Sequence, residues 1–158
     1  MEALHDDDNT MKCDAIRAMG MLKNPKFAAN LLAQITTCGS WIRTTLYTAL
    51  GDIGDRQAVK TLLTQLEAAY ESYELEALAI ALGKLKDPRA VRSLFPLLYH
   101  QLPTIRAAAA HALQEITGQD FGEDILRWRA WRKAEEAKHP NTVPETPYFP
   151  PDLPDRTG

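Results

Sequence analysis

Residues that could perform covalent chemistry are few in this sequence and are spread along it. The two cysteines, Cys13 and Cys38, form no C-x-x-C motif and lie in segments with a helical pattern, so buried free thiols are favoured over a disulfide or a zinc site. The four histidines lie near the chain ends or on two different helical segments, and no His-Glu dipeptide occurs. Because catalysis requires such groups to converge, we expect no catalytic, metal-binding or cofactor-binding residues, and no enzymatic activity.

Phosphate-binding motifs are absent as well. The glycines Gly51 and Gly54 belong to a Gly-Asp-Ile-Gly segment between two helical patterns, where a left-handed helix cap explains them better than a phosphate cradle. Neither a G-x-G-x-x-G nor a Walker sequence occurs. The sequence therefore gives no support to nucleotide binding.

The size and composition indicate one ordinary folded domain. The chain has 158 residues, of which 45% are hydrophobic and 25% charged, close to the average soluble protein. No stretch of eighteen apolar residues without a charge occurs, and the first nine residues carry four acids where a secretory signal would be basic and then apolar. We expect no membrane span and a cytoplasmic protein.

The charge is distributed unevenly. The net charge is -3. Acids exceed bases in residues 1–9 and 139–158, whereas the residues between these two ends hold 17 of the 18 bases and 14 of the 21 acids. This mildly basic middle lacks the clustered positive face that nucleic-acid binding requires. The charge pattern therefore does not favour a nucleic-acid partner.

A short motif recurs four times at intervals of 31 or 32 residues. Its four copies begin at Ala18, Ala49, Ala81 and Ala112, and read Ala-Met-Gly, Ala-Leu-Gly, Ala-Leu-Gly and Ala-Leu-Gln. A fixed period of this length is typical of stacked arrays in which each unit buries its apolar face against its neighbours. The sequence thus predicts a repeat architecture.

Each repeat contains two helical patterns. The first helix of the second repeat has an apolar stripe at helical spacing, formed by Ile42, Leu46, Ala49, Leu50 and Ile53. The same stripe returns in the first repeat as Met11, Ala15, Ala18, Met19 and Leu22, and it is expected to be buried there too. The third repeat has Glu74 at the first stripe position, which predicts that its opening turn reaches solvent or an ion-pair partner. The second helices repeat as Ala28, Leu31, Leu32 and Ile35, as Val59, Leu62, Leu63 and Leu66, and as Val91, Leu94, Phe95 and Leu98.

Capping residues mark the turns between these helices. Asn24-Pro25 and Asp87-Pro88 place a side-chain acceptor before a proline, as at a helix start, and Asp55 can cap the equivalent helix. Ser40 and Ser72 are predicted to cap the first helices of the second and third repeats. Pro96 lies within a helical pattern and predicts a kink or a split.

Two segments carry a resemblance to a known family. Ile42-Arg43 followed by Ala49-Leu-Gly-Asp-Ile-Gly-Asp55, and the segment from Ala81 to Val91, resemble the short bacterial HEAT-like repeat also found in phycobilin lyase subunits. The resemblance covers about residues 10–138. It implies an all-α, right-handed α-solenoid of about four HEAT-like helix pairs, and it implies that the basic residue Arg43 and its equivalent Arg106 pair with acids of a neighbouring repeat.

The two ends are expected to differ from the repeat domain. Residues 1–9 are predicted to be an acidic flexible N-terminus, and residues 139–158, with six prolines, a proline-rich extended tail. In the last helix, Ile125, Leu126 and a tryptophan are expected to pack inward. The basic residues expected to stay in water there are Arg127, Arg129, Arg132 and Lys133.

The second helices of HEAT-like pairs line the concave face, which implies a set of partner-binding candidates. These are Lys26, Asn30, Gln57, Lys60, Thr64, Arg89 and Arg92, together with Arg129 of the last helix and Tyr148 and Phe149 of the tail. The first hypothesis is a noncatalytic protein-protein interaction scaffold that binds a protein partner through this surface and the tail. The resemblance supports a second hypothesis, a phycobilin lyase-like chaperone or lyase subunit acting on bilin and phycobiliprotein. A third is a DNA-binding HEAT-like module.

Overall fold

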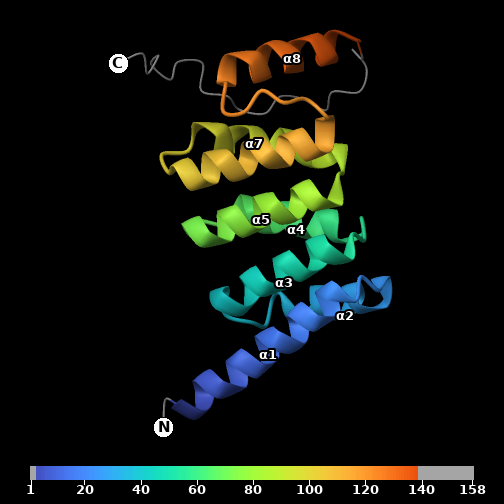
Figure 1. Cartoon of the computed structure of the whole chain (residues 1–158), viewed down its shortest axis with the longest axis vertical. Coiled ribbons are helices and arrows are strands. Elements are labelled where there is room, and N and C mark those ends of the chain that lie inside the picture. Colours follow the sequence, from blue (N-terminus) through green and yellow to red (C-terminus); the bar gives the residue numbers. More distant parts are fainter. Residues whose placement is uncertain (1–2, 139–158) are drawn as a thin grey trace. The chain divides into compact units, whose positions relative to one another are not determined.

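The computed structural model describes residues 3–138, with side chains from residue 8 onward (Figure 1). These residues fall into two units. The first unit, Met1–Glu123, contains the α-helices α1 (Ala3–Met21), α2 (Ala28–Gln34), α3 (Ser40–Ile53), α4 (Ala58–Ala68), α5 (Ser72–Leu85), α6 (Val91–Leu94) and α7 (Pro103–Thr117). It also has the 3₁₀ helices η1 (Pro25–Phe27), η2 (Pro88–Ala90) and η3 (Phe95–Tyr99). The second unit, Asp124–Gly158, contains α8 (Ile125–Lys138). Every regular element in the described residues is helical, and the predicted all-α solenoid is confirmed.

The first unit is a stack of first helices linked by second helices. Helix α1 packs on α3, α3 on α5 and α5 on α7, while α2, α4 and α6 with η3 connect successive layers (Figure 1). The largest fully buried aliphatic residues of this stack are Leu31, Ile35, Leu46, Leu50, Leu62, Leu78, Leu82, Leu94 and Leu98. Burying one such side chain contributes about 1.5–3 kcal/mol, so the layers hold together through their shared apolar stripes.

A glycine of each first helix touches an alanine of the next. The pairs are Gly20 with Ala49, Gly51 with Ala81, and Gly83 with Ala112. A Cβ atom built on any of these glycines would lie 2.8 to 2.9 Å from the alanine Cα atom. No side chain fits at that distance, so glycine lets the two backbones approach closely. The recurring Ala-x-Gly motif therefore supplies the glycine–alanine contacts between successive first helices.

The apolar stripe predicted for α1 is not buried, which corrects the expectation from the repeat pattern. Met11 and Leu22 are 71% and 68% exposed, while Cys13 and Ile16 are each 2% exposed and face the core. In the part of the chain that the structure describes, α1 packs against one first helix, α3, whereas α3 lies between two. The stripe of α1 therefore has no described neighbour to cover it.

Three of the predicted helix caps are confirmed. The side chains of Asn24, Asp55 and Asp87 each accept a hydrogen bond from the backbone N–H two residues later, at 3.1, 2.9 and 3.0 Å. The prolines that follow Asn24 and Asp87 open the 3₁₀ helices η1 and η2. The left-handed cap predicted at Gly54 is confirmed by its φ of 76°.

Two predicted caps are wrong by one residue. Ser40 and Ser72 are the first residues of α3 and α5, and the N-cap residues are Gly39 and Glu71. Neither helix start has a capping hydrogen bond from an N-cap side chain. The Ser40 hydroxyl instead accepts a hydrogen bond from Arg43 at 2.8 Å. The split expected at Pro96 is confirmed, because α6 ends at Leu94 and η3 follows.

The chain ends differ from the expectations in two respects. Helix α1 begins at Ala3, so residues 3–9, predicted as a flexible segment, are helical. In α8, Trp128 is fully buried and contacts Trp131 edge-on, but Leu126 is 69% exposed, so its predicted inward packing is wrong. The tail at residues 139–158 lies outside the described residues. None of the described helices has the length and hydropathy needed to span a bilayer.

Candidate functional site

An open hollow of about 420 Å³ lies between α1 and α3. Its lining residues are Arg17 and Met21 of α1 and Trp41, Thr44, Thr45, Thr48, Ala49 and Asp52 of α3. Because Trp41, Thr44 and Thr48 follow at helical spacing, they share one face of α3. Ligand pockets in proteins commonly fall in this size range, so the hollow can hold a small molecule. We name it the α1–α3 hollow.

The lining of the α1–α3 hollow includes an indole and several hydroxyl groups. Trp41 is 72% exposed. The hydroxyls of Thr44 and Thr48 donate to backbone carbonyls one turn earlier, at 2.8 and 3.0 Å, so their oxygens remain able to accept hydrogen bonds. The hydroxyl of Thr45 donates to the thiol of Cys13 at 3.6 Å.

Charged groups lie at the edge of the hollow. The Arg17 guanidinium contacts Asp14 at 3.0 Å on the surface of α1. Asp52 accepts a 2.6 Å hydrogen bond from Lys84 of α5. Both cations are exposed enough to contact an anionic ligand as well as their present partners. A flat, conjugated molecule with carboxylate groups matches this combination of indole and cations.

The chemistry of the hollow is that of binding. Its lining contains no cysteine, and the nearby thiol of Cys13 is buried beneath Thr45. A reactive thiolate must be accessible to its substrate, so covalent attachment to this thiol is not supported. The α1–α3 hollow can orient a ligand while another molecule supplies the reacting group.

An ion pair joins α3 to α5 beside the stack core. Arg43 contacts Glu74 at 2.8 Å, and the Glu74 side chain is 5% exposed. The hydrogen bond that Arg43 donates to Glu74 raises the pKa of Arg43, and burial, aided by the Glu74 charge, raises the pKa of Tyr47 to about 12. The pairing implied for Arg43 is confirmed, as is the ion-pair partner expected for Glu74. Arg106 contacts Glu123 at 2.9 Å, but this acid follows α7 within the same repeat, so the pairing with a neighbouring repeat implied for Arg106 is not seen among the described residues.

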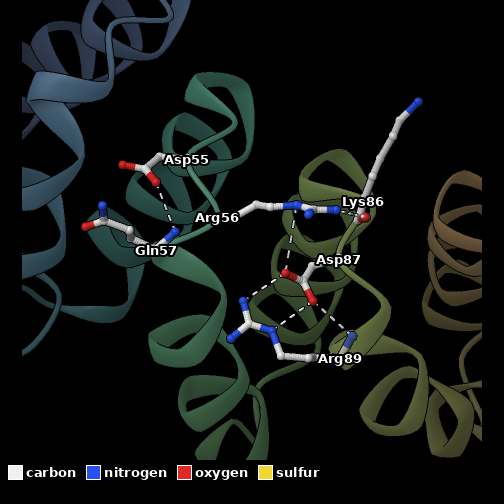
Figure 2. Close-up of polar contacts among 6 residues, drawn as sticks. All are labelled: Asp55, Arg56, Gln57, Lys86, Asp87 and Arg89. Carbon is white, nitrogen blue, oxygen red and sulfur yellow. Dashed lines mark hydrogen bonds and ion pairs between the residues drawn. The ribbon is translucent and has the colours of Figure 1, made fainter.

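A second polar network links two turns (Figure 2). Arg56 donates to the Lys86 carbonyl at 3.0 Å and lies 3.9 Å from an Asp87 oxygen, while Arg89 donates two side-chain hydrogen bonds to Asp87. The hydrogen bonds from Arg89, reinforced by the charge of Arg56, lower the pKa of Asp87 to about 2. The guanidinium of Arg89, a predicted partner-binding group, is therefore engaged within the chain.

None of the predicted partner-binding residues described in the first unit lines the α1–α3 hollow. Lys26 lies in η1, Asn30 in α2, Lys60 and Thr64 in α4, Arg89 in η2 and Arg92 in α6, while Gln57 is the N-cap residue of α4. Arg129 lies in α8 of the second unit. Asn30 accepts a hydrogen bond from Gln34, and the Thr64 hydroxyl donates to the Lys60 carbonyl. Tyr148 and Phe149 lie outside the described residues. Partner binding through this set stays a prediction.

Sequence reasoning missed the α1–α3 hollow because it placed binding on the second helices. One signal was available. Trp41 directly precedes the stripe residue Ile42, so its side chain cannot share the buried face of α3. The outward position of this indole is the feature of the sequence that points to this part of the surface.

The helical stack and its repeated glycine–alanine contacts indicate the class of protein to which the chain belongs. The family model for HEAT repeats matches residues 1–77 and 59–137, and the chain belongs to the HEAT repeat family. Its repeats are of the short kind found in phycobilin lyase subunits.

Three relatives have names that refer to bilin chemistry. The bilin biosynthesis protein PecE of Mastigocladus laminosus is 36% identical over 111 residues, which cover 69% of this chain and 40% of that protein. PecE of a Nostoc species is 32% identical over 119 residues, covering 74% of this chain and 47% of the relative. The phycocyanobilin lyase subunit alpha of a Picosynechococcus species is 26% identical over 128 residues, covering 73% and 48%. The chain thus spans less than half the length of each of these relatives.

These relatives overturn two expectations. The predicted noncatalytic scaffold and the predicted lack of enzymatic activity are both wrong, since the similar proteins include a lyase subunit and bilin biosynthesis proteins. The predictions failed because they required converging nucleophiles or metal ligands. A protein that binds and orients a reactive ligand carries no such pattern.

Proposed function

We propose that the chain acts on bilins as a phycobilin lyase-like subunit, which holds a bilin for transfer to a phycobiliprotein. The observation that carries this proposal is the 36% identity to a bilin biosynthesis protein over 69% of the chain. A subunit of this kind can orient a bilin whose acceptor group comes from another protein.

We assign the bilin to the α1–α3 hollow. A bilin is a flat, conjugated linear tetrapyrrole with two propionate groups and several pyrrole N–H groups. In this assignment Trp41 stacks on a pyrrole ring, Arg17 and Lys84 pair with the propionates, and Asp52 accepts from pyrrole N–H groups. Each of these side chains lies at or beside the hollow, and none of them needs to form a covalent bond.

Two protein partners complete the proposed function. One is the acceptor phycobiliprotein. The other is a second lyase subunit, which the name of the Picosynechococcus relative, subunit alpha, suggests for that protein.

A titration with phycocyanobilin tests the proposal. The purified chain is expected to shift and sharpen the visible absorbance of the bilin in a saturable way. Trp41→Ala should weaken binding about tenfold, which equals about 1.4 kcal/mol, and Arg17→Gln should weaken it less.

Tyr70→Ala is the matched control, because Tyr70 is also a highly exposed aromatic residue and does not line the hollow. Its binding should equal that of the unmodified chain. An absorbance spectrum that stays that of free bilin would reject the function, and equal weakening by both alanine variants would reject the assigned site.

A further inference from the structure

Three connections between helices gather cations that are far apart in the sequence. Each of them joins a first helix to its second helix, and they span residues 22–27, 54–57 and 86–90. Together these connections hold five cations and two acids. We name the cations the basic edge; they are Lys23, Lys26, Arg56, Lys86 and Arg89, all of them exposed.

The three connections lie at one edge of the stack in the first unit. Arg56 of the second connection reaches the third, where it donates to the Lys86 carbonyl at 3.0 Å (Figure 2). The first connection follows Gly20, which contacts Ala49 in the last turns of α3. The connections at the opposite edge hold no lysine or arginine; they are residues 35–39, 69–71 and 100–102. The cations of the turns are therefore confined to one edge.

The two acids of these connections are already used within the chain. Asp55 accepts a hydrogen bond from the backbone N–H two residues later, and Asp87 is buried. Arg56 and Arg89 share the single carboxylate of Asp87, yet their side chains remain 62% and 61% exposed. Because a guanidinium carries five N–H donors, each arginine can bind a further carboxylate from the solvent side.

Two of the lysines occupy a backbone conformation that disfavours them. Lys23 and Lys86 follow α1 and α5 with φ values of 49° and 50°, and no other residue except glycine has a positive φ in the described part of the chain. The equivalent positions after α3 and α7 hold the glycines Gly54 and Gly118. A side chain destabilises the left-handed conformation, whereas glycine adopts it readily. Lysine at these two positions therefore lowers stability, which points to a use for its charge.

We propose that the basic edge docks an acidic segment of a protein partner. Carboxylates of that segment pair with the two lysines of the first connection and with the three cations of the other two. Asp87 holds both arginines in position for this contact. Complementary charge of this kind favours the correct partner and speeds association. This inference does not rest on the bilin proposal.

A short acidic segment fits the edge better than a long polyanion. The next connection along the same edge, residues 118–123, holds two acids and no lysine or arginine. A nucleic-acid backbone that continued along the edge would meet these negative charges. Packed helices lie about 8–10 Å apart, so roughly 16–20 Å separate the first connection from the third. About six residues of extended chain span this distance.

The test measures the fluorescence anisotropy of a labelled peptide that carries two Glu-Glu pairs joined by about six Gly and Ser residues. The peptide is expected to bind saturably at about 50 mM salt and more weakly as the salt concentration rises. The double variant Lys23→Gln, Lys26→Gln should weaken binding about tenfold, and Lys86→Gln about threefold. Both arginines stay unchanged, because they hold Asp87.

A charge-matched variant is the control. Lys12→Gln combined with Lys133→Gln also removes two exposed lysines, and neither belongs to the basic edge. This control should change peptide binding by less than about twofold. Weakening equal to that of Lys23→Gln, Lys26→Gln would show that only the net charge matters and would overturn the inference, as would the absence of peptide binding at low salt.

A glycine at position 23 separates a binding role from a structural one. Lys23→Gly should raise the Tm by about 1–3 °C, because glycine relieves the left-handed backbone, and it should weaken peptide binding. A lysine after a helix also interacts favourably with the helix dipole. A lower Tm with unchanged peptide binding would assign Lys23 to that role and reject the proposal.

Short duplex DNA is the last comparison. At the same salt concentration, duplex DNA of about twelve base pairs should bind no more tightly than the peptide. Tighter binding of the duplex that the two lysine substitutions weaken, and that the control leaves unchanged, would assign the basic edge to nucleic acid instead.

Discussion

The joint between α1 and α3 and the joint between α3 and α5 share one backbone contact but differ in their side chains. Both place a glycine on an alanine. In the second joint, Asp52 pairs with Lys84 and Arg43 with Glu74. In the first joint, the residue equivalent to Asp52 is Met21, and the α1–α3 hollow lies beside it. The comparison teaches that the same glycine–alanine contact between helices can be flanked either by ion pairs or by an open hollow, according to the residues at a few outward positions.

The largest expected effect comes from breaking the shared backbone contact. Gly51→Leu should lower the free energy of unfolding by about 3 kcal/mol or more, because its side chain must enter space held by the Ala81 backbone. Gly20→Leu should cost less, since α1 can separate from α3 while the other layers stay packed. Urea denaturation measures both.

Gly39→Leu is the control for this prediction, because a Cβ atom on Gly39 meets nothing within 4 Å. It should cost under about 1 kcal/mol, the scale of an N-cap change. Equal losses of unfolding free energy for Gly39→Leu and Gly51→Leu would contradict the claim that the glycine–alanine contacts hold the helices together.

The next effect comes from the ion pair that only the second joint has. Glu74→Gln should destabilise the chain by about 2 kcal/mol, because the Arg43 charge loses a buried partner. A double-mutant cycle with Arg43→Met should give a coupling energy of about 1 kcal/mol or more. Additive losses in the cycle would show that the pair contributes no stability.

A smaller effect depends on pH and tests the polar network around Asp87 that links the two turns. The pKa of Asp87 is lowered to about 2 in the folded chain from an ordinary value of 3.8. The stability that its carboxylate provides is therefore present above about pH 4 and is lost as the pH falls through 2. Asp87→Asn should flatten the decline in Tm between pH 4 and pH 2, and an unchanged decline would reject this assignment.

The smallest expected effect concerns the exposed apolar stripe of α1. Leu22→Ala should change the free energy of unfolding by less than about 0.5 kcal/mol, as for other exposed positions. The equivalent substitution in the buried stripe, Ile53→Ala, should cost about 2 kcal/mol or more. Similar losses at the two positions would show that the α1 face is covered in solution.

The sequence was sufficient to predict the solenoid, because the spacing of Ala18, Ala49, Ala81 and Ala112 follows from the contact between successive helices. It predicted the wrong buried face for α1, because a repeat pattern encodes contact positions and does not state whether a neighbour is present. The α1–α3 hollow was missed for a related reason. Residues such as Trp41 and Thr48 have no catalytic signature, and only the packing of two helices brings them beside Arg17.

Hydrogen exchange measured with and without phycocyanobilin tests the central claim most directly. The account predicts slower exchange on bilin binding in peptides from α1 and α3, the two helices that line the hollow. It predicts no change in the first half of α5 or in α7. Protection confined to α5 and α7, or no protection anywhere at saturating bilin, would contradict the assignment of the α1–α3 joint as the bilin site.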